Sequence, residues 1–325
     1  MKLTTGYWRS QVLFAASELG VFEALAAGPL SSAEVATRCA SAPDHTERLL
    51  NGCVACGLLE KDAGRYANGR MATDYLTREA PQSLAHWVRF MGDCYRPWSG
   101  LAGAIRDGKP VVDGFEQIAR GTDYTRHIIL AMHEYALGPG RAIVGSLDLA
   151  GRRRLLDVGG GPGTYSILLA ERYPELAAEV LDLPPVLEIT REMITQYGMG
   201  ERVTTRAGNY VTDEFGTGYD VVLLSNMLHQ ESPETCVALL RKAHAALAEG
   251  GLLVIQLAFL NAEKDAPVWG VLQSLQLAVL YPQGRAYSFD EVLAMLPLAG
   301  FDDGRVQRMS LLRSESLILA TRHAS

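Results

Sequence analysis

Two short segments combine glycines and a carboxylate at a spacing that suits a nucleoside-type ligand. The run 155–158 reads as a strand, and the loop after it contains Gly159, Gly161 and Gly163. A second apolar run ends at Asp182, nineteen residues after Gly163. Glycines let a ligand approach the backbone, the helix after the loop offers free N–H groups, and an acid at the next strand end can accept bonds from two ribose hydroxyls. The spacing therefore predicts a site for an adenosine-containing cofactor.

The details of this loop favour one class of cofactor over another. A dinucleotide fingerprint reads Gly-x-Gly-x-x-Gly, whereas this loop reads Gly-x-Gly-x-Gly. Asp157 directly precedes it, and a carboxylate at that place favours a cation such as a sulfonium over a diphosphate. We therefore expect a sulfonium nucleoside, with a nicotinamide-dependent oxidoreductase as the weaker alternative.

A histidine follows the fourth predicted strand of the sheet. His229 comes four residues after the strand 220–225, at the edge where ligand crevices open in such sheets. Methyl transfer from a sulfonium is an in-line displacement with a neutral leaving group, so it needs alignment and a base for the acceptor proton. A neutral imidazole can take that proton at pH 7. Its position, together with the family resemblance given below, makes His229 the predicted general base.

The elements that must position these residues read as alternating strands and helices. A helix over 165–173 follows the glycine loop, and further strands are predicted over 203–207, 220–225 and 252–255. The chain closes with a predicted hairpin of strands 306–312 and 317–321, with its turn at Ser314 and Glu315. The pattern predicts an α/β, Rossmann-like sheet that ends in an antiparallel hairpin.

The first hundred residues read as a mostly helical, winged-helix domain. Helical spacing runs from Leu13 to Leu25, Ser31 and Glu34 form a capping box, and a helix over 44–59 precedes a polar turn at 62–64. The helix at 44–59 has few cationic side chains for phosphate contact, so dimerisation is favoured over a DNA-binding regulator. We divide the chain into a dimerisation domain (1–100), a helical linker that contributes to the acceptor pocket (101–150) and a cofactor domain (151–325).

Composition excludes several classes of partner. The chain has 325 residues, 48% of them hydrophobic, and a formal net charge of −7, which argues against nucleic acid and anionic membranes. The N-terminus lacks the apolar core of a signal peptide. Five cysteines without framework spacing suit a reducing cytoplasm, and Cys53-x-x-Cys56 has no second pair to complete a metal site. We expect a cytoplasmic protein with no metal.

Taken together, these motifs resemble those of the small-molecule O-methyltransferases, which include the plant caffeate type and bacterial relatives in natural-product pathways. The resemblance rests on the winged-helix-like N-terminal region (1–100), the glycine loop at 159–163, Asp182-Leu183-Pro184 and the segment 226–229 that ends in His229. It implies S-adenosyl-L-methionine as methyl donor, S-adenosyl-L-homocysteine as product, a small-molecule acceptor and a homodimer formed by the N-terminal domain.

The resemblance also assigns residues. It implies that Leu183 packs on adenine, that the turn at Asn209 reads the adenine edge, and that Met132 and a later helix contact the acceptor. The predicted cofactor residues are Asp157, Gly159, Gly161, Gly163, Asp182, Leu183, Asn209, Tyr210 and Ser225. The predicted acceptor residues are Met132, Trp269, Gln273 and Leu277.

The chain departs from the family at the groups that support the base. The family has carboxylates where this chain has Gln230, Gln256 and Ala286, and an imidazole without a carboxylate partner is less basic and less firmly oriented. The neighbouring Glu231 is interpreted as a helix-start charge. We therefore expect an acceptor that is itself acidic, such as a phenol conjugated to a carbonyl. C-methylation of an acidic carbon, and a SAM-binding enzyme that transfers no methyl group, stay as alternatives.

Overall fold

The structure is a computed structural model that describes residues 3–80, 82–121, 123–309 and 315–323. The chain forms two compact units, Met1–Arg96 and Pro97–Ser325, which are described separately. Within the described ranges, no helix combines the length and the apolar character needed to cross a bilayer.

The first unit combines short helices with a small antiparallel sheet. The strand order is β1-β3-β2, and β2 and β3 form a hairpin. This arrangement confirms the predicted winged-helix pattern. The elements are α1 (Gly6–Glu18), α2 (Val21–Ala24), β1 (Leu30–Ser31), α3 (Ser32–Arg38), α4 (Pro43–Ala55), β2 (Leu59–Asp62), β3 (Arg65–Asn68), α5 (Arg70–Tyr75) and α6 (Ala85–Trp98), the last of which crosses the boundary between the units.

Local sequence accounts for where these helices begin and end. Ser31 Oγ accepts a bond from the Glu34 N–H, and the Glu34 carboxylate accepts one from the Ser31 N–H at 2.7 Å, so the predicted capping box is confirmed. The prediction of one helix from Leu13 to Leu25 is wrong, because Gly20 has a φ of 74° and separates α1 from α2. The helix predicted over 44–59 ends earlier, at Ala55, and Leu59 begins β2.

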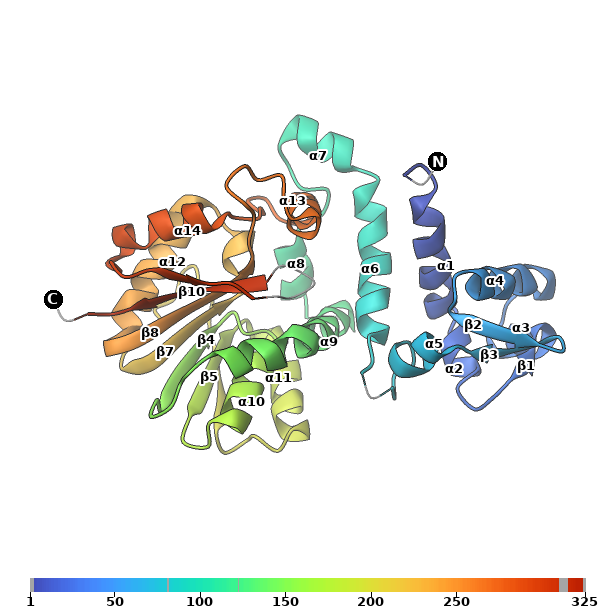
Figure 1. Cartoon of the computed structure of the whole chain (residues 1–325), viewed down its shortest axis with the longest axis horizontal. Helices are drawn as coiled ribbons and strands as arrows, with labels where there is room; N and C mark the ends of the chain where they lie inside the picture. The colour runs from blue at the N-terminus through green and yellow to red at the C-terminus, as the bar shows by residue number, and fades with distance from the viewer. Residues whose placement is uncertain (1–2, 81, 122, 310–314, 324–325) are drawn as a thin grey trace. The chain divides into compact units, whose positions relative to one another are not determined.

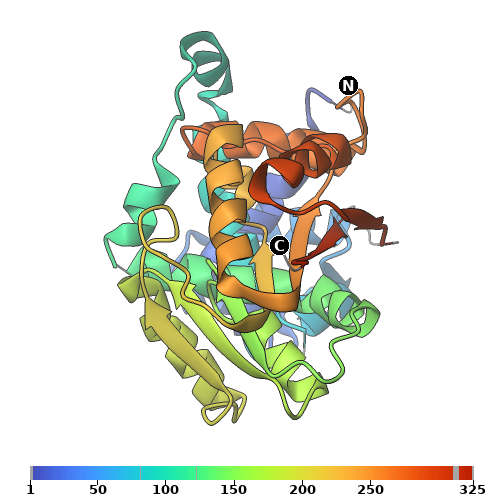
Figure 2. The ribbon, with the colours of Figure 1, turned by 90° about the vertical axis from the view of Figure 1, so that its left-hand side faces the viewer.

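The second unit is built on a seven-stranded sheet, which confirms the predicted fold class. Its order is β6-β5-β4-β7-β8-β10-β9, with β4 to β8 parallel and β10 antiparallel to both neighbours. Figures 1 and 2 show the sheet in two views, with β4, β5, β7, β8 and β10 labelled in Figure 1. The strands are β4 (Arg154–Val158), β5 (Ala177–Asp182), β6 (Val203–Ala207), β7 (Tyr219–Ser225), β8 (Leu247–Ala258), β9 (Arg305–Gln307) and β10 (Glu315–Thr321).

The terminal hairpin differs in detail from the prediction. β9 ends at Gln307, whereas the predicted strand continued to residue 312. The rest of that strand and the predicted turn residue Ser314 fall in the segment 310–314, which lies outside the described residues. Glu315, the other predicted turn residue, is instead the first residue of β10.

Helices cover both faces of this sheet (Figure 1). One face packs against α9 (Asp123–Ser146), α10 (Thr164–Arg172) and α11 (Pro184–Gln196), and the other against α12 (Pro233–Ala246) and α14 (Phe289–Met295). Leu155 and Leu156 of β4 accordingly belong to opposite cores. The remaining helices of this unit are α7 (Leu101–Asp107), α8 (Gly114–Ala119), α13 (Val268–Leu280), η1 (Leu228–Gln230) and η2 (Pro297–Ala299).

This layering decides where a site can form. Strands buried on both faces leave their carboxyl ends as the place where loops can hold a ligand. The carboxyl ends of β4, β5, β6 and β7 lie next to one another in the sheet order. These are the strands that precede the predicted cofactor residues and His229.

Candidate functional site

The loop after β4 has the backbone conformation that its glycines allow. Gly159, Gly161 and Gly163 have φ values of 63°, 54° and 73°, in the left-handed region that other residues seldom adopt. Gly163 is the N-cap of α10, which begins at Thr164, one residue before the predicted start. The Gly159 N–H donates to the Leu181 carbonyl at 2.8 Å and ties the loop to β5. The loop therefore presents bare backbone at the edge of the sheet.

Asp182 organises this loop as well as ending β5. Its Oδ2 accepts a bond from the Gly161 N–H at 2.8 Å, and its Oδ1 accepts one from the Leu183 N–H at 2.7 Å. Burial raises the pKa of this carboxyl to about 6. Each oxygen keeps a second lone pair, so the carboxylate can accept two hydroxyl bonds in addition. These acceptor positions fit the two hydroxyls of the ribose of an adenosyl cofactor.

Asp157 supplies a buried carboxylate beneath the same loop. The side chain is 1% exposed, and Ser166 Oγ donates to its Oδ2 at 2.8 Å. In the described part of the chain, its Oδ1 has no hydrogen-bond partner. Burial, with a smaller contribution from the charge of Asp182, raises its pKa to about 7. A cationic group beside Asp157 would balance the buried charge, which fits the sulfonium and ammonium of S-adenosylmethionine.

We expect Asp157→Asn to stabilise the ligand-free protein at pH 8 by on the order of 4 kcal/mol. The folded-state pKa of about 7 lies above the usual value of 3.8, so ionisation of Asp157 opposes folding. That cost is absent below about pH 4, grows as the pH rises and is complete above about pH 7. Chemical denaturation of the wild type and of Asp157→Asn from pH 5 to pH 8 measures this cost as a difference in the free energy of unfolding. A stability difference that does not change with pH would contradict the assignment.

The turn after β6 holds Asn209 and Tyr210 in different surroundings. Asn209 is exposed, and its Oδ1 accepts a bond from the Val211 N–H at 2.9 Å, so one lone pair is left for an adenine amino group. The Tyr210 hydroxyl donates to Glu231 Oε1 at 2.9 Å. A Cβ on Gly159 would lie 3.5 Å from the Tyr210 ring, so this ring lies against the glycine loop. Their roles in cofactor binding stay predictions.

Ser225 and Gln256 form a buried pair on neighbouring strands. Ser225 Oγ donates to Gln256 Oε1 at 2.5 Å, and the Gln256 side chain is fully buried. Gln256 Nε2 has no hydrogen-bond partner among the described residues. The predicted cofactor residue Ser225 is thus engaged with the strand next to it rather than with the glycine loop.

His229 lies in the 3-10 helix η1, four residues beyond the end of β7. Its side chain is 9% exposed, and burial lowers its pKa to about 4. Its carbonyl accepts a bond from the Arg285 N–H at 2.8 Å, and the next N–H, of Ala286, donates to Ser274 of α13. These two bonds connect His229 to the helix that bears the predicted acceptor residues.

The imidazole receives no carboxylate support within the described ranges. Ala286 is apolar, Gln256 bonds Ser225, and Gln230 Oε1 lies 3.3 Å from the Tyr210 hydroxyl. The interpretation of Glu231 as a helix-start charge is wrong, because it precedes the N-cap of α12 and its carboxylate binds Tyr210. The site therefore offers a neutral, weakly basic imidazole.

The predicted acceptor residues lie on two helices. Half-buried Met132 belongs to α9, whereas Trp269, Gln273 and Leu277 follow one another at four-residue intervals on α13 and so share a face. Among the described residues, no hydrogen bond joins the two helices at these positions, and an acceptor site between them stays a prediction. Sequence reasoning missed Gln276, whose Oε1 accepts a bond from Trp98 Nε1.

Two further residues of the glycine loop region gave no signal in the sequence motif. A Cβ on Gly160 would lie 2.6 Å from the Asp157 carboxyl carbon, so only glycine fits over that side chain. Thr190 of α11 donates to the Gly161 carbonyl at 2.6 Å and holds the loop from the helix side. Thr190 and Gly161 are twenty-nine residues apart, so only the fold brings this pair together.

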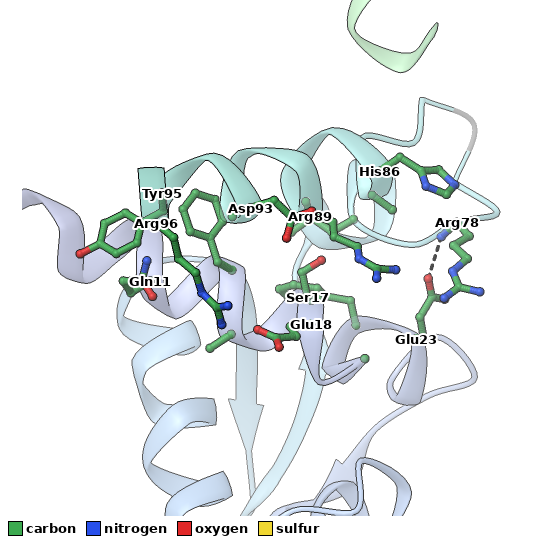
Figure 3. A pocket seen from close by; sticks show the side chains of 17 residues that line it. Gln11, Ser17, Glu18, Glu23, Arg78, His86, Arg89, Asp93, Tyr95 and Arg96 are labelled. Atoms are coloured by element: carbon green, nitrogen blue, oxygen red, sulfur yellow. Dashed lines mark hydrogen bonds between the residues drawn. The ribbon is translucent and has the colours of Figure 1, made fainter. Parts of the chain in front are cut away.

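A separate cavity of about 490 Å³ lies in the first unit (Figure 3). Its walls come mainly from α1 and α6, and include Glu18, Arg89 and Asp93. The Arg78 N–H donates to Glu23 Oε1 at its rim, at 2.9 Å. A second cavity, in the other unit, lies beside Phe259, Phe289 and Arg308. Neither contains a predicted cofactor or acceptor residue.

Comparison with known families covers nearly the whole chain. Residues 82–302 match the O-methyltransferase domain, and residues 1–78 match the O-methyltransferase dimerisation domain. The resemblance that the motifs indicated is confirmed by these matches.

Individual relatives of the chain support the same family. The chain is 34% identical to the 3-hydroxy-5-methyl-1-naphthoate 3-O-methyltransferase of Streptomyces sahachiroi, over 95% of this chain and 90% of that protein. It is 32% identical to the L-tyrosine C(3)-methyltransferase of Streptomyces lavendulae, over 92% of this chain and 85% of that one. The crystal structure of human N-acetylserotonin methyltransferase in complex with SAM superposes with a TM-score of 0.90 at 29% identity, covering 99% of this chain and 96% of the human chain.

The loop geometry, the paired bonds of Asp182 and the family matches lead to one assignment. The chain belongs to the O-methyltransferase family and is an S-adenosylmethionine-dependent methyltransferase.

Proposed function

We propose that the chain methylates a hydroxyl of an aromatic or polyketide-like small molecule, with His229 taking the acceptor proton. The observation that carries this proposal is the buried imidazole of His229, which follows β7 at the edge of the sheet where the glycine loop lies. With a pKa near 4, the imidazole is unprotonated at neutral pH and can accept a proton.

The residues around the glycine loop hold the cofactor. S-adenosylmethionine, when bound, supplies a methyl group on a sulfonium. Asp182 accepts the ribose hydroxyls, Asp157 faces the cationic part, and Gly159, Gly161 and Gly163 let the ligand approach the backbone. Around the adenosyl group we place Leu183, Asn209, Tyr210 and Ser225.

The weak base narrows the class of acceptor. An imidazole without a carboxylate partner takes a proton effectively only from an acceptor that gives it up readily. A phenol next to a carboxyl or carbonyl group meets that condition, because the anion is stabilised by conjugation. The relative from Streptomyces sahachiroi is named for 3-O-methylation of a hydroxynaphthoate, an acceptor of this kind. The acceptor would lie between Met132, in the segment 101–150, and the face of α13 that carries Trp269, Gln273 and Leu277.

C-methylation is the second candidate, and a specific observation favours it. Gln230, Gln256 and Ala286 leave His229 without a carboxylate, and an acidic carbon needs less help from a base than an ordinary hydroxyl does. The relative from Streptomyces lavendulae is named as a methyltransferase that acts on a carbon. A SAM-binding enzyme that transfers no methyl group is the third outcome.

Mass spectrometry with methyl-labelled S-adenosylmethionine tests this proposal. The purified protein is incubated with ortho-acyl phenols, hydroxynaphthoates and β-dicarbonyl compounds, with simple phenols as the matched control set. A labelled product with fragments of an aryl methyl ether supports O-methylation, and a label on carbon supports the second candidate. An isomer without label, formed only when S-adenosylmethionine is present, would overturn both.

We also propose that the first unit joins two copies of the chain in the cytoplasm. The dimerisation domain matches residues 1–78, and the aromatic side chains of Tyr7 and Trp8 on α1 are 49% and 60% exposed. Tyr95 stacks on Tyr7 at 6.4 Å between ring centroids. The cysteines are free, which suits a reducing compartment. Light scattering tests the dimer, and a monomer at micromolar concentration would contradict it.

We expect Gly160→Ala to weaken binding of S-adenosylhomocysteine by about tenfold. The added methyl would lie 2.6 Å from the Asp157 carboxyl carbon and would push the loop away from its position. Isothermal titration calorimetry measures the dissociation constant. Gly200→Ala is the matched control, because a Cβ there meets nothing within 4 Å and its φ is not in the left-handed region. Equal affinities of the two variants would contradict the prediction.

A further inference from the structure

A buried histidine outside the proposed chemistry connects three helices on one face of the sheet. His133, in the middle of α9, is 7% exposed. Its Nδ1 lies 2.8 Å from the Thr164 hydroxyl, and its Nε2 lies 3.0 Å from the Tyr197 hydroxyl. Both ring nitrogens are therefore engaged, each by a different helix.

The two hydroxyls occupy special positions in their helices. Thr164 is the first residue of α10 and directly follows Gly163, an N-cap that has no side chain to bond the first turn. Tyr197 is the C-cap of α11, the helix that starts two residues after Asp182. The imidazole thus contacts the first residue after the glycine loop from α9, thirty-one residues earlier in the chain.

The chemistry of the ring suits this position. Burial lowers the pKa of His133 to about 4, so the ring is neutral at physiological pH. A neutral imidazole donates from one nitrogen and accepts at the other, and a hydroxyl can do either. Both bonds can therefore form together without a buried charge.

We propose that His133 is a positioning residue that fixes the first turn of α10, and with it the glycine loop, in the geometry that binds S-adenosylmethionine. Thr190 holds the Gly161 carbonyl from α11, and His133 holds the other end of the loop from α9. The bond to Thr164 carries this role, and the bond to Tyr197 orients the ring. The proposal rests on the cofactor site described above.

Calorimetry with S-adenosylhomocysteine tests the proposal without any acceptor. We expect His133→Leu and Thr164→Val each to raise the dissociation constant by about tenfold, the effect of one buried hydrogen bond. The double variant should bind no more weakly than either single variant, because both changes remove the same bond. His133→Asn, whose amide reaches the Nδ1 position but not the Nε2 position, should restore binding to within about threefold of the wild type.

The controls separate positioning from folding. His127→Asn alters another buried histidine of α9 and should leave the dissociation constant unchanged, whatever its effect on the melting temperature. Wild-type affinity in His133→Leu, with only a lower melting temperature, would overturn the proposal. Weak binding in Thr164→Val alone would also overturn it, since Thr164 would then act on the ligand directly. Failure of the wild-type protein to bind S-adenosylhomocysteine would instead overturn the cofactor assignment.

Discussion

Replacing His229 with alanine should lower the rate of methyl transfer by about 10²- to 10⁴-fold, the usual contribution of a general base. Binding of S-adenosylhomocysteine should stay within about threefold of the wild type, because most of the residues proposed to hold it follow β4, β5 and β6 rather than β7. A labelled-methyl assay gives the rate, and calorimetry gives the affinity. The expected result is thus a lower kcat with an almost unchanged affinity for the cofactor product.

The pH dependence gives this prediction a second readout. The imidazole has a pKa of about 4 and is already in its base form at pH 5, so its ionisation should not change the wild-type rate between pH 6 and pH 8. Below about pH 5 protonation should slow the reaction. An ordinary histidine would instead produce the change near pH 6.5. His244→Ala, on α12 and in ring contact with Phe301, is the control for loss of a histidine elsewhere.

A rate that His229→Ala leaves unchanged at every pH would show that the base assignment is wrong. The acceptor would then react as an anion that it forms by itself, and the protein would contribute alignment alone. That outcome would leave the cofactor assignment intact. It would also favour the most acidic members of the proposed acceptor class.

The second large effect is expected at Asp182. Asp182→Asn should weaken S-adenosylhomocysteine binding by about 100-fold, or about 2.7 kcal/mol. The Gly161 N–H donates to one oxygen of the Asp182 carboxylate, and the Leu183 N–H donates to the other. An amide offers one oxygen and one NH₂ group, so one of the two N–H donors would face another donor. The glycine loop would shift, and one ribose hydroxyl would lose its acceptor.

Asp220 provides the matched control for this variant. It also accepts two backbone bonds, from the Arg153 and Arg154 N–H groups at 2.7 and 2.9 Å, but it lies at the amino end of β7, opposite the site. Both bonds go to the same oxygen, so an amide can preserve them. Asp220→Asn should therefore bind S-adenosylhomocysteine like the wild type. Equal losses in both variants would show that Asp182 acts only through folding.

The parts of the fold that sequence predicted are those set by short-range patterns. The capping box at Ser31, the strands over 203–207 and 220–225 and the turn of the glycine loop each depend on residues a few positions apart. Predictions failed where a local signal was ambiguous. Apolar spacing continues from α1 into α2, and only the backbone of Gly20 reveals the break.

The contacts that refine the site could not be predicted in the same way. The Tyr210 hydroxyl binds Glu231, twenty-one residues later, and His133 binds Thr164, thirty-one residues later. Neither pair shares an element or a motif, so only the packing of the strands and helices brings them together. Gly160 illustrates the same limit, because its lack of a side chain matters only once Asp157 is known to lie beneath it.

The place of β10 in the sheet has a consequence for how the chain folds during synthesis. β10 leaves the ribosome after the other described strands of this sheet, yet it lies between β8 and β9. Until residues 315–321 emerge, the edge of β8 from Leu252 to Ala258 has no partner, and almost all of its side chains are apolar. A translation product that stops before Glu315 would therefore expose an aggregation-prone edge, and we expect it to require a chaperone or to be degraded.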